Sequence, residues 1–181
     1  MEAPGDKRVW FAMSAPYRNE MKAKEKLDDI GVEYFVPMRY VVTERGGVKR
    51  RSYVPVVRNL IFVREEEAKM TALKTYVPAL QYKMYKNGDG MMCKAVVRDE
   101  EMASFIKVCK EKAEGLTFYT PDEVDLKKGQ HIRILGGPLD GAEGYFVKVK
   151  GSRSKKFVVS VSGFITVAAS VSVDLIEVIK D

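Results

Sequence analysis

The 181-residue sequence predicts an α+β fold in two parts, a mixed domain of strands and helices followed by a small all-β barrel. Apolar residues at helical spacing occur only in the first 113 residues, where they alternate with strand-like runs. After residue 124, five short β runs follow one another at regular intervals without a helical period. The segment around Gly115 and Pro121 has no sustained period, so we place a linker at 114–123 between domains at 8–113 and 124–181.

The first domain opens with a strand and a helix. Arg8–Ala15 is a short aromatic and apolar run, which predicts a central strand. Pro16 suits the opening turn of the helix that follows, and Gly31 is placed to end it. Glu33–Met38 is expected to form a second strand, interrupted by Pro37.

A basic hairpin follows. Two β-branched arms, Tyr40–Thr43 and Ser52–Val57, flank Gly46-Gly47, which predicts a tight turn at the tip. Four basic residues crowd around this tip: Arg45, Lys49, Arg50 and Arg51. On this pattern alone, a solvated hairpin whose charges discourage edge-to-edge aggregation is favoured over a nucleic-acid site.

The rest of the domain alternates again between strands and helices. Asn59–Arg64 is a nearly all-apolar run of the kind buried on both faces of a sheet, and Glu65–Thr75 is a helix that begins with three acids. A hairpin is expected from Leu80–Tyr85 to Lys94–Val97. Arg98–Ala113 is the strongest helix, because apolar residues recur at i, i+3, i+4 and i+7: Met102, Phe105, Ile106 and Cys109.

The C-terminal part predicts five strands: His131–Leu135, Tyr145–Val149, Phe157–Val161, Ile165–Ala169 and Leu175–Ile179. Within it, Gly129–Gly144 reads GQHIRILGGPLDGAEG and continues as YFVKVKG. Glycines at these spacings permit positive φ and close backbone approach in a twisted hairpin. The run resembles the KOW motif of transcription and ribosomal proteins, which indicates a binding module.

Bulk properties exclude several classes of protein. Cys93 and Cys109 have no metal-ligand spacing and His131 is the sole histidine, so we expect neither a metal site nor a cofactor. No nucleophile elbow or phosphate loop occurs, so we expect no enzyme. The N-terminus lacks the apolar run of a signal peptide, so we expect a cytoplasmic protein that does not enter a membrane. The formal charge of +6 is clustered, which suits either a polyanion partner or a soluble basic surface.

The order of these elements resembles the NusG family of bacterial transcription elongation and antitermination factors. The resemblance rests on the strand with Trp10-Phe11, the basic hairpin, the NLIFV strand at Asn59–Val63 and the KOW-like barrel. It implies an N-terminal NGN domain, an RRM-like α/β sandwich whose antiparallel sheet has flanking helices, and a C-terminal SH3-like KOW barrel. Housekeeping members carry Pro-Gly-Tyr where this chain has Arg58-Asn59-Leu60. Specialised paralogs of the RfaH and UpxY types are therefore the nearer match. The C-terminal strands of this chain are rich in valine, which favours a domain that is always folded as a β-barrel.

The resemblance implies that the N-terminal domain binds the clamp of bacterial RNA polymerase. The matching polymerase-binding positions are Trp10, Leu60, Phe62 and Thr71. Leu60 and Phe62 share one face of their strand and Ile61 takes the other, so ordinary core remains the alternative. A histidine that accompanies Thr71 in specialised members is missing here.

The resemblance also implies partners for the two basic regions. The hairpin is a candidate site for the displaced non-template DNA strand, through Arg45, Lys49, Arg50, Arg51 and Tyr53. In the barrel, Val161-Ser162-Gly163-Phe164 stands where housekeeping members carry Ile-Phe-Gly-Arg, which disfavours Rho and leaves ribosomal protein S10 open. The candidate partner contacts there are Phe164, Lys148, Lys150, Lys155 and Lys156.

The function implied is that of a monomeric, non-enzymatic factor that suppresses pausing or termination on long operons, such as those for surface polysaccharide. The alternative is an RNA-binding or ribosome-associated KOW protein that makes no polymerase contact. This alternative centres binding on the basic loop of the barrel, Lys148–Lys156.

Overall fold

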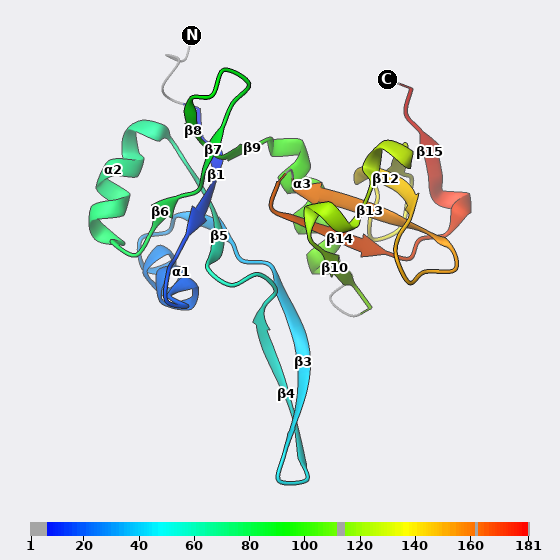
Figure 1. Ribbon diagram of the computed structural model, residues 1–181, viewed down its shortest axis with the longest axis horizontal. Coiled ribbons are helices and arrows are strands. Elements are labelled where there is room, and N and C mark those ends of the chain that lie inside the picture. Colours follow the sequence, from blue (N-terminus) through cyan, green and yellow to red (C-terminus); the bar gives the residue numbers. More distant parts are fainter. Residues whose placement is uncertain (1–6, 112–114, 162, 181) are drawn as a thin grey trace. The chain divides into compact units, whose positions relative to one another are not determined.

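The computed structural model describes residues 7–111, 115–161 and 163–180 (Figure 1). Its contacts divide the chain into two compact units, one that ends at Asp99 and one that begins at Glu100. Every strand pair among the described residues is antiparallel, and the helices there are few. The mixed class with antiparallel sheets is therefore confirmed.

A five-stranded sheet forms the centre of the first unit. Its order is β2 (Glu33–Phe35), β5 (Leu60–Glu65), β1 (Val9–Ser14) and β6 (Gln81–Tyr82), and β9 (Val96–Val97) also pairs with β1. The two central strands, β1 and β5, pair over their whole length, from Val9 opposite Glu65 to Ser14 opposite Leu60. Their apolar residues are buried on both faces, as the NLIFV run predicted.

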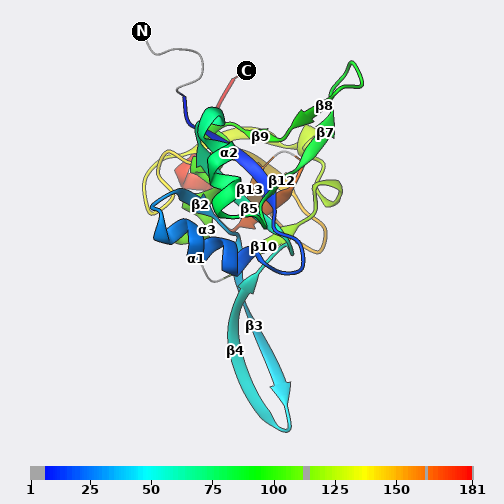
Figure 2. The ribbon, with the colours of Figure 1, turned by 90° about the vertical axis from the view of Figure 1, so that its left-hand side faces the viewer.

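Two helices cover one face of this sheet. Figure 2 shows α1 (Glu20–Asp29) and α2 (Glu67–Tyr76) on the same side of the central strands. Residues of both helices share one apolar cluster with alternate residues of these strands. The cluster joins Ala23 and Leu27 of α1 and Met70 and Leu73 of α2 to Phe11, Met13, Ile61 and Val63. The side chains that lie on the other face of the central strands include Trp10, Ala12, Leu60 and Phe62.

The expected start of α1 at Pro16 was wrong. The helix begins at Glu20, after Tyr17 and Arg18 in the left-handed region with φ of 59°. The side-chain amide of Asn19 donates to the Pro16 carbonyl at 2.8 Å and closes this turn. The chain thus reverses from β1 in an irregular loop before the helix starts, and propensity alone gave no sign of that loop. At the other end, Gly31 has φ of 66° and ends the helix as predicted.

The basic hairpin is a two-stranded arm, β3 (Met38–Arg45) and β4 (Val48–Pro55), longer than the sequence indicated. Gly46 and Gly47 both have positive φ, 59° and 77°, so they form the two-residue turn whose twist matches the strands. Figures 1 and 2 show the arm extending away from the sheet of its own unit. We call residues Met38–Pro55 the arm.

The predicted hairpin after Leu80 is present, but it divides into two parts. Its base, β6 and β9, pairs with β1, while β7 (Met84–Lys86) and β8 (Met92–Lys94) form a separate two-stranded ribbon. The division occurs where the Ala12 amide donates to Ala95 and the Ala12 carbonyl accepts from Lys83, so both sides of the hairpin pair with β1.

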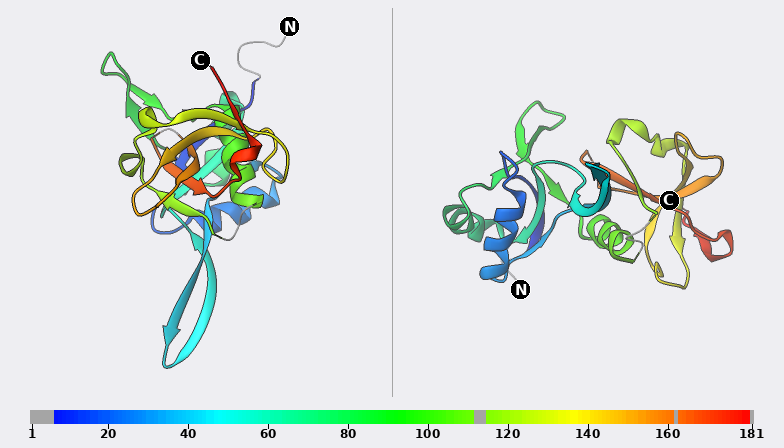
Figure 3. Two further views of the ribbon diagram at one scale, coloured as in Figure 1. Left: turned by 90° about the vertical axis from the view of Figure 1, so that its right-hand side faces the viewer. Right: turned by 90° about the horizontal axis from the view of Figure 1, so that it is seen from below.

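The second unit consists of α3 (Asp99–Glu111, with Asp99 in the first unit) and a six-stranded sheet (Figure 3). The sheet order is β10 (Thr117–Tyr119), β14 (Ile165–Ala169), β13 (Lys155–Val161), β12 (Glu143–Lys148), β11 (Gln130–Ile134) and β15 (Ile176–Val178). The five predicted strands are confirmed. Strand β10 was not expected, because it lies within the predicted linker 114–123, where its three residues pair with β14.

Short helical turns and α3 complete this unit. Turns of 3-10 helix occupy Pro121–Glu123, Leu126–Lys128 and Val173–Leu175. The Ser104 hydroxyl of α3 accepts from the Glu143 amide at 3.1 Å, and Lys107 donates to the Asp140 carbonyl. The helix is therefore tied to the hairpin between β11 and β12. Burial raises the pKa of the Cys109 thiol to about 12, which suits the buried apolar role predicted for this residue.

Gly144 shows why the glycine-rich run is needed. A Cβ atom on this residue would lie 2.4 Å from the Val158 carbonyl oxygen and 2.8 Å from the Phe157 ring. Strand β12 thus approaches β13 more closely than any side chain allows. Gly136, Gly137 and Gly141 act differently, because each has a positive φ of 70–83° in the turn between β11 and β12.

We predict that Gly144→Ala destabilises the protein by about 1–3 kcal/mol, because backbone oxygen and a buried ring must both shift to admit the methyl group. Urea unfolding followed by circular dichroism measures the change. Gly88→Ala is the matched control, since a Cβ atom on Gly88 would meet no atom within 4 Å and its φ is not positive. Equal stability of the two variants would contradict this account of Gly144.

Candidate functional site

The arm concentrates the charge of the chain. It contains five basic residues and one acidic residue, a formal charge of +4 out of the chain's +6. Its strands are exposed from Arg39 and Tyr40 to Tyr53, with Val41 half-buried. Within the described residues, Arg39, Arg45, Lys49 and Arg50 make no ion pair with a carboxylate. An unpaired basic ribbon of this kind attracts a polyanion.

The register separates the arm's functional residues onto two faces. Tyr40 pairs with Tyr53, Val42 with Arg51 and Glu44 with Lys49, so these six residues share one face. The other face carries Arg39, Arg45 and Arg50 among β-branched and small residues. The five residues expected to act together are thus divided, with Lys49, Arg51 and Tyr53 on the first face and Arg45 and Arg50 on the second.

The first face carries an aromatic pair that the sequence analysis missed. The rings of Tyr40 and Tyr53 lie 4.6 Å apart between centroids, and the Arg51 guanidinium lies 3.8 Å from the Tyr40 ring. Arginine stacked on an aromatic face keeps its charge exposed while its position is fixed. The signal was present in the sequence, since Tyr40 and Tyr53 are equidistant from the Gly46-Gly47 turn and must pair across a regular hairpin.

Trp10, Leu60 and Phe62 are brought together by the central strands. They lie on the sheet face opposite Ile61 and Val63, as strand alternation predicted. All three are buried, with exposed fractions of 4%, 1% and 0%. The apolar side chains of β5 are therefore buried on both faces, from Leu60 to Val63, and only Arg64 and Glu65 at its end are half-buried.

Thr71 lies elsewhere, exposed on α2. Lys74 and Thr75 follow it at i+3 and i+4, so the three side chains share one face of the helix. This face is separate from the layer that contains Leu60 and Phe62, because α2 packs on the opposite side of the sheet.

The candidate contacts of the second unit lie in and around the β12–β13 hairpin. Lys148, Lys150 and Lys155 are exposed, and Lys155 lies 5.9 Å from the Phe146 ring. Lys156 differs, because its amine donates to the Ser170 hydroxyl at 2.6 Å. Phe164 is half-buried beyond the end of β13, and Ser162 lies outside the described residues.

Comparison with known proteins identifies the first unit. A family model described as transcription termination factor nusG matches residues 8–106, more than half of the chain. The chain belongs to the NusG family. The match covers the central sheet, the arm, α1 and α2, and it ends within α3. No curated protein matches the chain.

Membership sets the general class of function. NusG factors are non-catalytic transcription factors that take part in elongation and antitermination and interact with RNA polymerase. Within the described residues, no helix has the length and hydrophobicity needed to cross a bilayer.

Asn59 adopts a backbone conformation that is most often found for glycine. The residue has φ of 61°, in the left-handed region that glycine and asparagine tolerate best. Its side-chain oxygen accepts from the Arg18 amide at 3.1 Å, and its carbonyl accepts from the Ala15 amide at 3.2 Å. Asn59 thus joins the loop after β1 to the start of β5.

We predict that Asn59→Ala costs about 1–2 kcal/mol more than Asn59→Gly. Both variants lose the side-chain hydrogen bond to Arg18, so the difference between them isolates the cost of positive φ. Thermal and urea unfolding of the two variants measure this difference. An alanine variant as stable as the glycine variant would show that the loop relaxes to another conformation.

Proposed function

We propose that this protein is a specialised transcription elongation and antitermination factor that binds the RNA polymerase clamp through its first unit. The family match over residues 8–106 carries the proposal, because this region contains the sheet, the arm and α2. The proposed role is to keep the polymerase processive and to suppress pausing or termination. We place the protein with paralogs of the RfaH and UpxY types, acting as a cytoplasmic monomer on long operons such as surface polysaccharide loci.

In this proposal, Trp10, Leu60 and Phe62 form the apolar layer against which the polymerase docks, and Thr71 makes a second contact. Because Leu60 and Phe62 are buried in the free chain, docking against them requires that this face of the sheet opens. The polymerase must then bind the open form tightly enough to offset the cost of opening. Leu60 and Phe62 would then act as apolar anchors, the kind of residue that contributes most of the binding free energy at protein interfaces.

The arm is proposed to hold the displaced non-template DNA strand. Arg45, Lys49 and Arg50 provide sequence-independent attraction to phosphates, and Tyr53 provides a surface for an unpaired base. The Tyr40 ring lies beside Tyr53, and the Arg51 guanidinium stacks on the Tyr40 ring. The surface for the base is therefore larger and more rigid than a single tyrosine ring. In this proposal, the face of the arm that contains Tyr53 stacks on bases, and basic residues on both faces attract phosphates.

The second unit is proposed to be an SH3-like KOW barrel that binds a separate partner. Its antiparallel strand order and the close approach at Gly144 support this interpretation. We propose domains at 8–113 and 124–181 with a connecting segment at 114–123. Ribosomal protein S10 is the proposed partner class, with contacts at Phe164, Lys148, Lys150, Lys155 and Lys156, and Rho is not expected to bind.

We predict that the protein retains bacterial RNA polymerase in co-purification, and that Leu60→Val/Phe62→Leu lowers the retained amount at least about fivefold, the effect of losing about 1 kcal/mol at an anchor. Ile61→Val/Val63→Ala is the matched control, because it trims the same strand on the face covered by α1 and α2. Circular dichroism first confirms that both variants are folded.

The control variant should retain polymerase at the level of the unmodified protein. If the unmodified protein retains none, polymerase binding is wrong, and the RNA or ribosome alternative becomes the leading explanation. If both variants lose polymerase equally, docking does not use the face that contains Leu60 and Phe62.

We predict that Arg45→Gln/Lys49→Gln/Arg50→Gln weakens binding of a single-stranded DNA oligonucleotide and lowers the salt slope of log K by about 2, because about 0.7 is lost for each phosphate contact. Tyr53→Leu should weaken binding without changing the slope, since stacking releases no counterions. Fluorescence anisotropy at several salt concentrations measures both quantities. The control Lys7→Gln/Lys22→Gln/Lys127→Gln removes the same amount of charge outside the arm. If this control loses as much affinity as the arm variant, the loss is an effect of net charge and not of the arm.

A further inference from the structure

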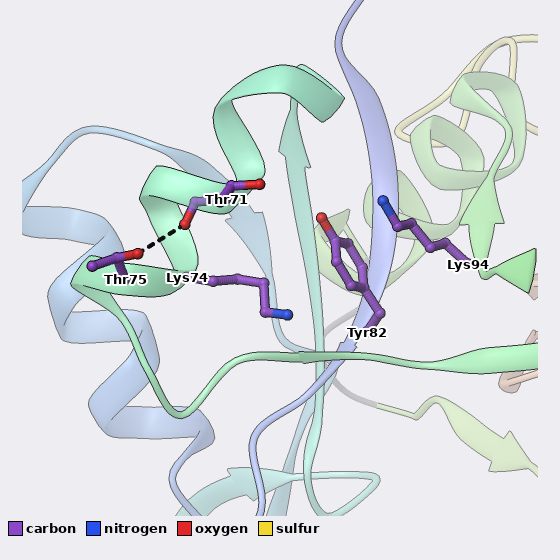
Figure 4. A pocket seen from close by; sticks show the side chains of 5 residues that line it. All are labelled: Thr71, Lys74, Thr75, Tyr82 and Lys94. Atoms are coloured by element: carbon purple, nitrogen blue, oxygen red, sulfur yellow. Dashed lines mark hydrogen bonds between the residues drawn. The ribbon is translucent and has the colours of Figure 1, made fainter.

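A basic pocket lies in the first unit beside α2 (Figure 4). It has a volume of about 320 Å³ and is lined by Thr71, Lys74 and Thr75 of α2, Tyr82 of β6 and Lys94 of β8. The helical residues reach it because they share one face of α2 at i, i+3 and i+4. Two ammonium groups and three hydroxyl groups thus meet in one hollow.

The Tyr82 ring lies between the two lysine amines of this pocket and is held in place by the core. The amines of Lys74 and Lys94 each lie 4.6 Å from the centroid of its ring, and Figure 4 shows them on either side of it. The ring also makes an edge contact with Phe11 of the core at 5.5 Å. Burial is the largest cause that raises the pKa of the phenol, so its hydroxyl stays protonated and able to donate at neutral pH.

The two lysines differ in their charge partners. Lys94 donates to the Glu67 carboxylate at 2.6 Å, and this hydrogen bond is the main cause that raises the pKa of Lys94. Lys74 has no carboxylate partner within the described residues, and its amine lies against the Tyr82 ring. Among the hydroxyl groups, Thr75 donates to the Thr71 carbonyl at 3.1 Å, while the Thr71 hydroxyl makes no bond to any residue that the structure describes. The pocket therefore holds one uncompensated positive charge with a free hydroxyl group near it.

The surroundings favour a single anionic group over a polyanion. The three acids before and at the start of α2 are taken up by other cations, Glu65 by Arg8, Glu66 by Lys69 and Glu67 by Lys94, so Lys74 is left as the one cation of the pocket without a carboxylate partner among the described residues. The arm emerges next to β2, at the opposite edge of the sheet from β6. A nucleic-acid strand on the arm would thus have to cross the sheet to reach Lys74. A carboxylate side chain needs only one cation and one or two hydroxyl donors, which the pocket offers.

We propose that this pocket binds a carboxylate side chain in an acidic segment of a protein partner. Lys74 supplies the charge, the Thr71 hydroxyl and the Tyr82 hydroxyl supply hydrogen bonds, and Glu67 holds Lys94 in place. The inference deepens the proposed function and rests on it, because Thr71 belongs to both surfaces. Its test nevertheless uses no polymerase, so failure here and failure of polymerase binding are separate results.

The experiment is a titration of the full-length, isotope-labelled protein with an N-acetylated, C-amidated tetraglutamate peptide, followed through backbone amide resonances. A tetraglutamine peptide with the same end groups is titrated in parallel as the uncharged probe. We expect saturable shifts at Thr71, Lys74 and Thr75 with tetraglutamate, and affinity at least fivefold lower for Lys74→Gln. Lys22→Gln is the matched control, since it removes one exposed charge from α1 and should leave the affinity unchanged. The same spectra show whether each variant is folded.

Four outcomes would overturn the proposal. The first is the absence of saturable shifts at these amides, and the second is an equal response to the tetraglutamine peptide. The third is tighter binding of inorganic phosphate or an oligothymidylate at the same amides, which would assign the pocket to phosphate groups. The fourth is affinity that falls equally in Lys74→Gln and Lys22→Gln, because the effect would then be one of net charge.

Discussion

The pairing of β1 with β5 is the constraint on which the first unit depends. Their six-residue register places Phe11, Met13, Ile61 and Val63 against α1 and α2, and a slip of one residue would exchange these side chains with those of the other face. Each fully buried apolar side chain contributes about 1.5–3 kcal/mol, so such an exchange would be costly. The same register positions Arg64 between Trp10 and Glu33 in neighbouring strands, where it bonds Glu33 at 3.3 Å and Asp99 at 3.4 Å. The arm is rooted between β2 and β5, so its direction is also set by this ladder.

The elements that the sequence predicts well are those with a complete local signal. The apolar run of β5, the helical spacing in α3 and the Gly46-Gly47 turn each determine one element without help from the rest of the chain. The predictions that were wrong concern segments whose structure is determined by pairing with distant strands. Strand β10 exists because β14 offers it an edge, and the hairpin after Leu80 divides because β1 takes up both of its sides. The loop before α1 depends on Asn19 and Asn59, whose hydrogen bonds cannot be deduced from propensity.

The same distinction applies to the candidate sites. The basic character of the arm is visible in the sequence, and its two faces follow once the turn is known. The pocket beside α2 has no such signal, because Thr71 comes from a helix, Tyr82 from β6, which pairs with β1, and Lys94 from β8, which pairs with β7. Leu60 and Phe62 were assigned to one face correctly by alternation, but alternation does not indicate whether a face is covered. Burial is a property of the whole fold, and it is what makes opening of that face part of the proposed function.

The distribution of charge explains how one small unit can offer two different anion sites. Elsewhere in the unit, several basic side chains pair with acids, as Lys24 does with Asp28 and Lys94 with Glu67, and such exposed pairs add little field at a distance. The arm lacks these partners over most of its length, so its field extends toward solvent and attracts a charged strand. Lys74 is instead a single charge that lies against the Tyr82 ring beside the Lys94–Glu67 pair, and salt screens one such charge beyond about 10 Å. Long-range attraction at one edge of the sheet and short-range recognition at the other can therefore operate in one unit, because the arm and the pocket lie at opposite edges of its sheet.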